Sequence, residues 1–447
     1  MRSFNRRSTL GLVSGGLMAG VAGGTLLGRG ARAEVVVADV PAPGYEIESG
    51  AELRVLRPAK FVAGDEELFL ANSKKFTDQT GVAVRVDQES WQDLRPKTAV
   101  AANVGTGPDI VLAWNDDPHQ YPEKILDLTD LADYLGKKYG GWAPLAETMG
   151  KGPDGNWICI PVGASGGKMV YRDSWMKEAG FSEFPKDTAG FLELAKALQG
   201  IGHPVGFTLG QAEGDANTFC HWMLWAHGAS VVDENGKVTL DSPETRAALA
   251  YGTELYKTFI PGTLSWLDPS NNKAFLAGEV SVVANGISVY YAAKTSDDPA
   301  LKEMAEDIGH APMPIGPVGR PTETALTVSG MIFGHTKYPN AAKEYLRFMM
   351  EKEQYEPWQE ASIGYWAHSL NAYDGNPVWT VDPKHTPYQK IMTESLPYGY
   401  KGPLGYASAG TLADYIVVTM VSSVVSGAAS PDDAIAEATR RAERYYR

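Results

Sequence analysis

The stretch that decides the fold reads LRVL at 53–56, DEELFLANSKKFTDQTG at 65–81, VAVRV at 82–86, DLRPKTAVAANV at 93–104 and DIVLA at 109–113. Short β-branched and leucine-rich runs predict three strands, and the two longer periodic runs between them predict helices. The order β-α-β-α-β is typical of a parallel sheet. Ligands bind such sheets outside the carboxyl ends of the strands. We therefore expect the loop at 114–118 to lie beside a ligand site.

Local signals support both predicted helices. Leu68, Phe69 and Phe76 recur near helical spacing on one face of the first helix. Gly81 follows that helix where a left-handed C-terminal cap belongs. Pro96 falls in the first turn of the second helix, where its missing N–H costs nothing.

Several segments resemble one known family, the extracellular solute-binding proteins (family 1, maltose-binding-protein-like) of ABC transporters. In chain order they are KFTDQTGV at 75–82, GPDI at 107–110, NNKAFLAGEV at 271–280, PNAAKEYLRF at 339–348 and SPDDAIA at 430–436. The resemblance implies an α/β fold of the periplasmic binding protein type II. In that fold two α/β lobes are joined by a hinge, with a ligand cleft between them.

The resemblance also implies a division of the chain. We expect an N-terminal lobe of residues 51–163 and 328–354, and a C-terminal lobe of residues 164–327 and 355–447. The chain would cross between the lobes near three hinge positions: Gly163, Thr327 and Gln354. Residues 34–50, which contain several prolines and glycines, are expected to form a flexible leader.

Residues 1–33 carry an export signal pattern. Arg6 and Arg7 precede an apolar run at 10–27 that is rich in glycine, and Ala31-Arg32-Ala33 fits a small-x-small cleavage site. Paired arginines before a weakly apolar run are typical of a twin-arginine signal, with cleavage after Ala33 and a periplasmic destination. A general secretory signal and a retained membrane helix are the alternatives.

The charge balance restricts the class of partner. The chain has 40 basic and 54 acidic residues, and residues 1–33 contain five arginines and no acid. Cleavage would leave 35 basic residues against 54 acidic ones, a net charge of −19. This charge disfavours nucleic acid and anionic membranes as partners.

The motifs of enzymes and metal sites are weak in this chain. Gly163 to Gly167 reads G-A-S-G-G and matches the hydrolase pattern G-x-S-x-G, but that motif needs a helix after its serine. The predicted segment after it is a strand at 168–171. The histidines lack metal-ligand spacing, and we expect no cofactor and no metal. Cys159 and Cys220 are too few for a disulfide framework, and we expect two buried thiols.

Aromatic and polar residues in predicted loops and helix starts form the candidate ligand site. Flat rings suit the C–H face of a sugar, and carboxylates or amides suit its hydroxyls. Trp114 and Asp116 occupy the strand-end loop where the resembled family contacts sugar; the alternatives are a packing tryptophan and a loop-capping carboxylate. The further candidates are Glu89, Trp91, Asn217, Trp222, Trp266, Asn285, Tyr290 and Trp366.

The resemblance and these residues together predict a monomeric periplasmic receptor of an ABC importer. It would capture a carbohydrate or polyol by hinge closure, deliver it to the membrane permease subunits and catalyse no reaction. Two alternatives stay open. One is a receptor for a non-sugar solute such as glycerol phosphate, a polyamine or a metal chelate. The other is a secreted hydrolase with Ser165 as nucleophile.

We expect the double substitution Arg6→Lys and Arg7→Lys to trap the precursor in the cytoplasm, because the twin-arginine route recognises the arginine pair itself. Cell fractionation with immunoblotting measures the ratio of precursor to mature protein. Arg29→Lys with Arg32→Lys is the matched control, since it leaves the pair intact. Normal export of the first variant would favour the general secretory route.

Overall fold

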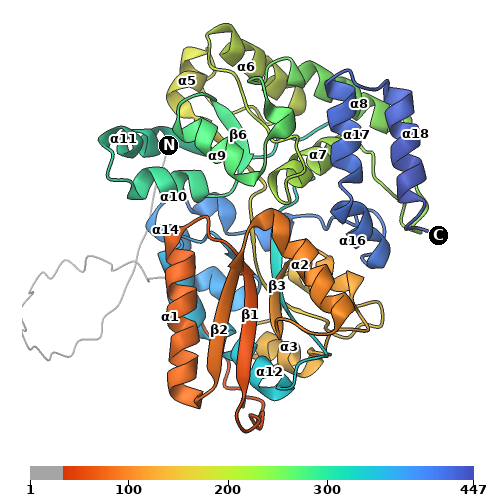
Figure 1. Ribbon diagram of the computed structural model, residues 1–447. Helices are drawn as coiled ribbons and strands as arrows, with labels where there is room; N and C mark the ends of the chain where they lie inside the picture. Colours follow the sequence, from red (N-terminus) through yellow and green to blue (C-terminus); the bar gives the residue numbers. More distant parts are fainter. Residues whose placement is uncertain (1–33) are drawn as a thin grey trace, which may run out of the picture. The chain divides into compact units, whose positions relative to one another are not determined.

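The computed structural model describes residues 34–447, so the predicted export signal at 1–33 lies outside the described residues. The predicted β-α-β-α-β order is confirmed. The five elements are β1 (Glu52–Pro58), α1 (Ala63–Thr80), β2 (Ala83–Glu89), α2 (Trp91–Val104) and β3 (Ile110–Trp114). β1 pairs in parallel with both β2 and β3 and lies between them, while α1 and α2 flank the strands (Figure 1).

The ends of α1 and α2 form as their residue types require. Gly81 and Gly105 adopt left-handed φ angles of 78° and 72° and donate their N–H groups to carbonyls of the preceding turn. Ser90 caps the start of α2 by accepting a hydrogen bond from the backbone N–H of Asp93 at 3.2 Å. α2 begins at Trp91, two residues before the expected start, so Pro96 lies inside the helix and not in its first turn as expected.

Two sheets organise the described part of the chain. The six-stranded sheet has the order β2-β1-β3-β8-β4-β9, and its last three strands, which pair antiparallel, are β8 (Leu326–Ile332), β4 (Ile160–Ser165) and β9 (Ala367–His368). The antiparallel three-stranded sheet consists of β6 (Val282–Asn285), β5 (Lys168–Arg172) and β7 (Ile308–Pro312) in spatial order. We call the parts built on these sheets the first and second lobes. The expected class of two α/β lobes is confirmed.

Helices fill the intervals between the strands. Between β3 and β4 the chain forms η1 (Asp117–Gln120), α3 (Thr129–Lys138) and α4 (Pro144–Gly150). Between β5 and β8 it forms α5 (Asp173–Glu178), α6 (Thr188–Gly200), α7 (Asp215–Ala226), α8 (Pro243–Tyr256), η2 (Thr263–Ser265), α9 (Asp268–Leu276), α10 (Ser288–Thr295) and α11 (Pro299–Asp307). After β8 it forms α12 (Pro339–Met350), α13 (Lys352–Ala361), η3 (Asn371–Gly375), α14 (Val378–Val381), η4 (Thr386–Tyr388), α15 (Ile391–Glu394), α16 (Tyr406–Ala413), α17 (Ile416–Val425) and α18 (Pro431–Ala442).

We call each segment in which the chain crosses from one lobe to the other a passage. The first two passages lie side by side. Gly166 and Gly167, with φ angles of 91° and 72°, connect β4 of the first sheet to β5 of the second. A Cβ on Gly167 would lie 2.4 Å from the carbonyl oxygen of Thr324, which belongs to the returning passage between β7 and β8. The buried salt bridge between Lys168 and Glu323 joins the same two passages. Contact between the passages leaves little freedom other than hinge bending.

The three expected hinge residues lie inside regular elements. Gly163 is within β4, opposite Val328 and His368, and Thr327 is within β8. Gln354 lies in α13. The first two are thus within a few residues of a passage, and their role in bending stays a prediction.

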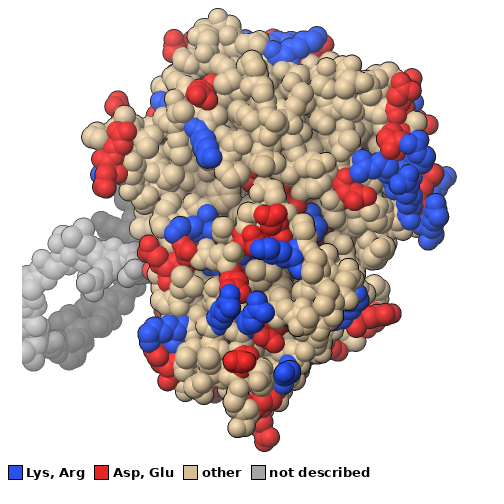
Figure 2. Space-filling view, in the orientation of Figure 1, with Lys and Arg blue, Asp and Glu red and all other residues tan. Residues whose placement is uncertain are grey.

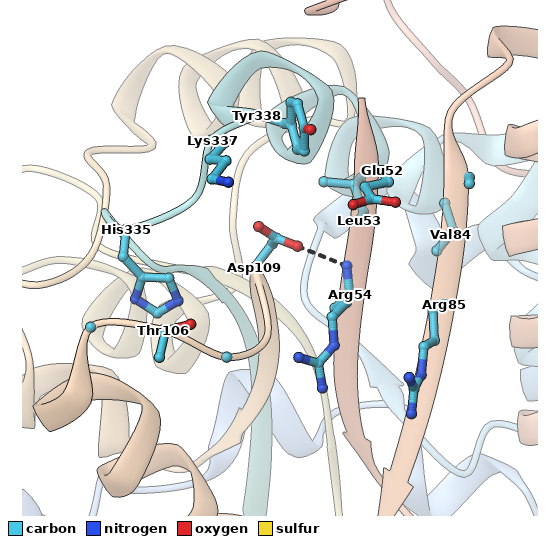
Figure 3. Close-up of a pocket in the computed structure, with 13 residues that line it drawn as sticks. Glu52, Leu53, Arg54, Val84, Arg85, Thr106, Asp109, His335, Lys337 and Tyr338 are labelled. Carbon is cyan, nitrogen blue, oxygen red and sulfur yellow. Dashed lines mark hydrogen bonds between the residues drawn. The ribbon is translucent and has the colours of Figure 1, made fainter. Parts of the chain in front are cut away.

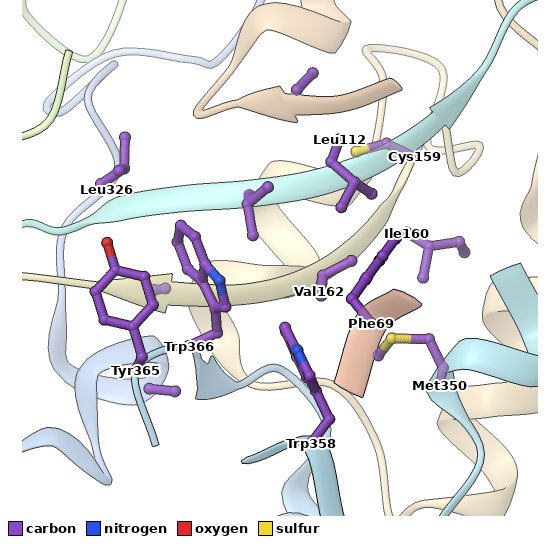
Figure 4. Packing of buried hydrophobic residues seen from close by; sticks show 14 of the residues in the cluster. Phe69, Leu112, Cys159, Ile160, Val162, Leu326, Met350, Trp358, Tyr365 and Trp366 are labelled. Atoms are coloured by element: carbon purple, nitrogen blue, oxygen red, sulfur yellow. The ribbon is translucent and has the colours of Figure 1, made fainter. Parts of the chain in front are cut away.

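The expected return to the second lobe at Gln354 differs from the structure. Figure 4 shows Trp358 of α13 packed with Phe69 of α1, Leu112 of β3 and Val162 of β4. The Trp358 indole Nε1 also donates to the backbone oxygen of Asp65 at 3.1 Å. Further along, β9 still pairs with β4 of the first sheet. These contacts keep the chain with the first lobe well beyond 355, and the third passage follows α15.

The expected flexible leader also differs from the structure. Residues 34–50 contain no helix or strand, yet they are held against the first lobe. Val35 is buried with 1% exposure, and the Ala38 N–H donates to the Lys138 carbonyl at 2.9 Å. The Glu48 carboxylate accepts hydrogen bonds from the backbone N–H groups of Asn340 and Ala341 at the start of α12. A buried side chain and a helix-capping carboxylate fix this segment despite its prolines and glycines.

The two cysteines are free and buried. Cys159 lies in the hydrophobic core of the first lobe, whereas Cys220 lies in that of the second, within α7. The thiols therefore serve as small apolar side chains, as expected.

One helical stretch of the described residues, Tyr406–Val425, is long and apolar enough to cross a membrane, with a hydropathy of 1.4. It consists of α16 and α17, and 67% of its apolar window is buried inside the protein. That burial is typical of a core helix in a globular protein.

We expect Lys168→Met to lower the free energy of unfolding by about 3–5 kcal/mol, because it leaves the buried Glu323 carboxylate without its cation. Urea unfolding of the ligand-free protein measures the change. Lys177→Met is the control, since Lys177 is exposed and pairs with Asp173 on the surface, where such pairs contribute about 0–1 kcal/mol. Equal losses in both variants would contradict the role of the pair at the passages.

Candidate functional site

A small cavity of about 20 Å³ lies where the two lobes meet. Its lining residues come from strand ends and helix starts of both lobes: Phe61, Trp91, Ser165, Gly166, Gly214, Asp215, Thr218, Asp268, Asn285, Gly286, Leu326 and Tyr365. Trp91 follows the carboxyl end of β2, and Ser165 and Asn285 end β4 and β6. This is the edge at which α/β sheets bind ligands. This volume has room for about one water molecule, so the lobes are nearly closed on one another here and would have to part to admit a ligand.

Three aromatic rings form the apolar wall of the cavity. The Phe61 and Trp91 rings meet edge to face with centroids 4.4 Å apart, and the Tyr365 ring lies nearly parallel to that of Phe61 at 6.4 Å. The Trp91 indole N–H donates to the Ala59 carbonyl at 2.9 Å, which fixes the ring. These faces can cover the C–H surface of a ligand ring.

Two carboxylates form the polar side of the cavity: Asp215 at the start of α7 and Asp268 at the start of α9. The Asp268 carboxylate accepts three backbone N–H groups, those of Glu213, Gly214 and Asp215, each at 2.9 Å. It therefore holds the first turn of α7 in place. Asp215 is the first residue of that helix, and its Oδ2 accepts the Asn271 Nδ2–H at 2.7 Å. Burial raises the pKa of Asp268 to about 6, and burial together with the Asp268 charge raises the pKa of Asp215 well above its usual range.

The lobes touch at the end of β6. Asn285 donates through Nδ2 to Oδ1 of Asn271 at 3.1 Å, and its own Oδ1 accepts the Gly286 N–H at 2.6 Å. A Cβ on Gly286 would lie 2.6 Å from the Ser165 hydroxyl oxygen at the end of β4. Glycine is thus required here for the close approach that shapes the cavity floor.

A buried ion cluster joins the lobes beside the cavity. The Arg95 guanidinium of α2 donates to Asp117 of η1 at 2.7 Å and to Glu213, which precedes α7, at 2.8 Å. The Tyr415 hydroxyl also donates to Glu213. Burial raises the pKa of Asp117 to about 7; Arg95 opposes the rise and the Glu213 charge adds to it. One cation of the first lobe is therefore shared with a carboxylate of the second.

Of the ten residues that the sequence suggested, Trp91 and Asn285 line the cavity. Trp114 is fully buried behind Trp91, with ring centroids 4.6 Å apart, and its indole N–H donates to the Trp91 carbonyl at 3.2 Å. Asp116 is also fully buried and accepts the Ser408 hydroxyl of α16 at 2.9 Å. The structure thus places this pair at the expected strand end but outside the cavity lining.

The remaining suggested residues are bonded elsewhere. Glu89 pairs with Lys97 on the surface, and the Trp222 indole N–H donates to the Pro314 carbonyl at 3.0 Å inside the second lobe. Asn217 of α7 donates to the carbonyl of Glu213, which precedes that helix, and the Tyr290 hydroxyl donates to Asp382. Trp266 packs against Gly206 and Gly210, and Trp366 is buried 6.4 Å from Trp114. None of these six lines the cavity.

Sequence reasoning missed Phe61, Tyr365, Asp215 and Asp268. Asp268 and Asp215 carried a usable signal, since each stands at the first position of a helix. Tyr365 adjoins the suggested Trp366, and only the backbone direction after α13 decides which ring faces the cavity. Phe61 lies in a bend after β1 that has no sequence signature.

The structure around Ser165 differs from a hydrolase elbow. Ser165 lines the cavity, but β4 passes through Gly166 and Gly167 into β5, a strand rather than a helix. Among the described residues that line the cavity there is no histidine to act as a base. Residues 34–447 also contain no group of three or more potential metal ligands.

A larger surface hollow of about 550 Å³ lies at the opposite, amino-terminal end of β1 and β2 (Figure 3). Some of its polar groups are already paired: Asp109 accepts from the Arg54 backbone N–H at 2.8 Å and from the Thr336 hydroxyl at 2.6 Å. The Arg54 and Arg85 side chains both pair with Asp87. Charges of both signs alternate over these strands (Figure 2). The hollow lies at the end of the sheet opposite to the edge at which α/β sheets bind ligands.

Comparisons with known proteins agree with this architecture. A family model described as a bacterial extracellular solute-binding protein matches residues 71–387. A putative binding protein of Brucella abortus (strain 2308) is 22% identical over 288 residues, 62% of this chain and 66% of the relative. YcjN of Escherichia coli (strain K12), a putative ABC transporter periplasmic-binding protein, is 24% identical over 308 residues, 64% of this chain. The chain thus spans 66% of the length of either relative, slightly under two thirds.

Solved structures share the fold at low identity. Maltose-bound MalE3 of T. maritima is 19% identical with a TM-score of 0.76, covering 88% of this chain and 100% of that chain. An ABC transporter solute-binding protein of Agrobacterium radiobacter K84 in complex with ribitol is 19% identical with a TM-score of 0.74, covering 88% and 98%. One of Agrobacterium vitis S4 with D-mannitol is 18% identical with a TM-score of 0.72, covering 88% and 98%.

The raised pKa of Asp117 predicts a pH dependence. Its carboxyl keeps a proton in the folded protein up to about pH 7, but in the unfolded chain only up to about pH 4. The folded state therefore binds more protons in this window, and its stability falls as the pH rises, by at most about 1.4 kcal/mol per unit for one proton.

Asp117→Asn should remove this contribution. As the pH rises from about 4 to about 7, the free energy of unfolding of the wild type should fall relative to that of the variant, and above about pH 7 the two free energies should change in parallel. Urea unfolding of both ligand-free proteins across this range measures the difference. Asp432→Asn, at an exposed carboxylate, is the control. Parallel profiles of wild type and Asp117→Asn would contradict the raised pKa.

Proposed function

The chain belongs to the bacterial extracellular solute-binding protein family, and from this premise we propose that it is the receptor of an ABC importer for a sugar or polyol. The ligand would bind in the cavity between the lobes and be handed to membrane permease subunits. As members of this family are ligand-binding receptors, the chain is not an enzyme.

The lining of the cavity carries the proposal. A sugar or polyol presents apolar C–H groups and hydroxyls on different sides. Trp91, Phe61 and Tyr365 supply flat apolar faces, and Asp215 and Asn285 supply polar groups opposite them. The cavity of about 20 Å³ has no room for a sugar, so the lobes would have to open to admit a sugar ring or a polyol. The structural neighbours bound to ribitol and D-mannitol are consistent with such ligands.

Hinge closure is the proposed conformational change. Residues of both lobes line the cavity, so a ligand contacts its full set of partners when the lobes are together. Arg95, shared between Asp117 and Glu213, would stabilise that closed arrangement. We place the bending at the adjacent passages near Gly163 and Thr327, and at the third passage after α15.

We also propose delivery to the periplasm through the twin-arginine route, with Arg6 and Arg7 as the signal and cleavage after Ala33. The family description, an extracellular protein, supports export as such. The proposed working form is a monomer.

A thermal-shift panel of sugars and polyols tests the function. A ligand at 100 times its dissociation constant adds about 2.7 kcal/mol of stability, and small-angle scattering should show compaction on binding. A panel of this breadth without any shift would contradict the assignment of the ligand class.

We expect Trp91→Ala to weaken binding of the best panel ligand by about tenfold or more, because a buried aromatic contact of this kind contributes at least about 1–2 kcal/mol. Isothermal titration calorimetry measures the affinity. Trp175→Ala is the matched control, as Trp175 stacks on His203 with centroids 3.8 Å apart, away from the cavity lining. Unchanged affinity in Trp91→Ala would show that the ligand binds elsewhere.

A further inference from the structure

Carboxyl groups are the only ionisable acids and bases of ordinary range among the described residues that line the cavity between the lobes. Asp215 and Asp268 are its two ionisable carboxylates. Among the described residues that line it, there is no lysine, arginine or histidine. A ligand that enters therefore meets a site with no cation to offer it.

The two carboxylates differ in how many of their oxygens can still accept a hydrogen bond from a ligand. Asp268 is occupied by three backbone N–H groups and serves the start of α7. Asp215 receives one hydrogen bond, from Asn271 to its Oδ2. Its Oδ1 accepts none from the described residues, although the residue lines the cavity and is only half-buried. One carboxylate oxygen is thus available to a ligand.

The nearest buried cations are bound to other carboxylates. Arg95 pairs with Asp117 and Glu213, both of which are buried. Lys168, three residues after Ser165 of the lining, pairs with Glu323. Moving either cation toward Asp215 would leave its own partner uncompensated, which costs several kcal/mol. Without ligand, the raised pKa of Asp215 lets a proton neutralise its carboxylate, and an ammonium group on a ligand could take the place of that proton.

The aromatic wall acts in the same direction. The faces of Trp91, Phe61 and Tyr365 carry the negative side of the ring quadrupole and attract a cation placed over them. An anion would be repelled both by these faces and by the carboxylate. A neutral hydroxyl can still donate to the free oxygen of Asp215.

We propose that Asp215 sets the charge selectivity of the cleft, so that the receptor rejects anionic sugars and polyols and favours those bearing a protonated amine. The inference rests on the proposed function and narrows its ligand class. Sugar phosphates, uronates and aldonates are excluded, and amino sugars and amino polyols are preferred over their neutral parents.

Two series of probes separate charge from shape. D-glucitol, glucamine and gluconate share one six-carbon chain and end in a hydroxyl, an ammonium and a carboxylate. D-glucose, glucosamine and glucuronate form the ring series, and putrescine is an amine without hydroxyls. Calorimetry at low ionic strength gives the affinity of the wild type for each probe.

In whichever of the two series the neutral compound binds, the anion should bind at least about tenfold more weakly than the neutral compound. The amine of that series should bind at least as tightly as the neutral compound. Asp215→Asn keeps the shape and removes the charge. It should cost the amine about ten- to a hundredfold in affinity and bring the three affinities together. Asp215→Ser is the second variant, since serine is accepted at helix starts. Asp432→Asn, which removes one exposed charge, is the control and should leave all ratios unchanged.

The outcomes separate the two proposals. If the neutral probes bind but gluconate or glucuronate binds as tightly, or if Asp215→Asn leaves the ratios unchanged, the charge selectivity is overturned while the sugar assignment stands. If putrescine binds and no hydroxylated probe does, the sugar assignment is overturned while the selectivity stands. Binding of the anions alone overturns both.

Discussion

The contact between the two passages that join the lobes is the constraint on which the rest of the structure depends. Gly167 approaches the Thr324 carbonyl so closely that a Cβ would lie 2.4 Å from it, and Lys168 pairs with Glu323 beside this contact. Because the outgoing and returning chains cross together, the end of β4 and the starts of β5 and β8 are fixed relative to one another. Ser165, Gly166 and Leu326 of the cavity lining are therefore part of the connection itself.

Buried charges then divide into those that hold the lobes and those that face the ligand. Asp268 holds the first turn of α7 through three N–H groups, and Arg95 is shared between carboxylates of both lobes. Such groups are costly to bury and are stable only when fully paired. Asp215 faces the cavity instead, and its Oδ1 has no hydrogen-bond partner in the described chain. A receptor that must favour the closed state only with ligand present can use such an incomplete site, since the ligand supplies the missing interaction.

The aromatic and acidic residues at the end of β3 show how far local reasoning extends. The sequence correctly predicted the strand and the position of Trp114 and Asp116 at its carboxyl end. It carried no information on α16, nearly 300 residues later, whose Ser408 reaches Asp116 at 2.9 Å. Trp114 does not reach the cavity for a similar reason, because the ring of Trp91 in the neighbouring α2 packs between Trp114 and the cavity. Residues at the right edge of a sheet can thus face the core when a distant helix covers them.

The sequence by itself determined the β-α-β-α-β order and the helix ends at Gly81 and Gly105, because propensities, caps and hydrophobic periods act within a few residues. The class of two α/β lobes followed from the resemblance of several segments to the solute-binding family. Only the tertiary structure decided the course of the chain after Gln354, the fixed position of residues 34–50 and the choice of Tyr365 over Trp366 at the cavity. Each of these depends on contacts between residues far apart in sequence, such as Trp358 with Asp65 or Glu48 with Asn340. A side chain at a loop or helix start turns toward the core or the cleft according to what packs against it, and no local pattern records that.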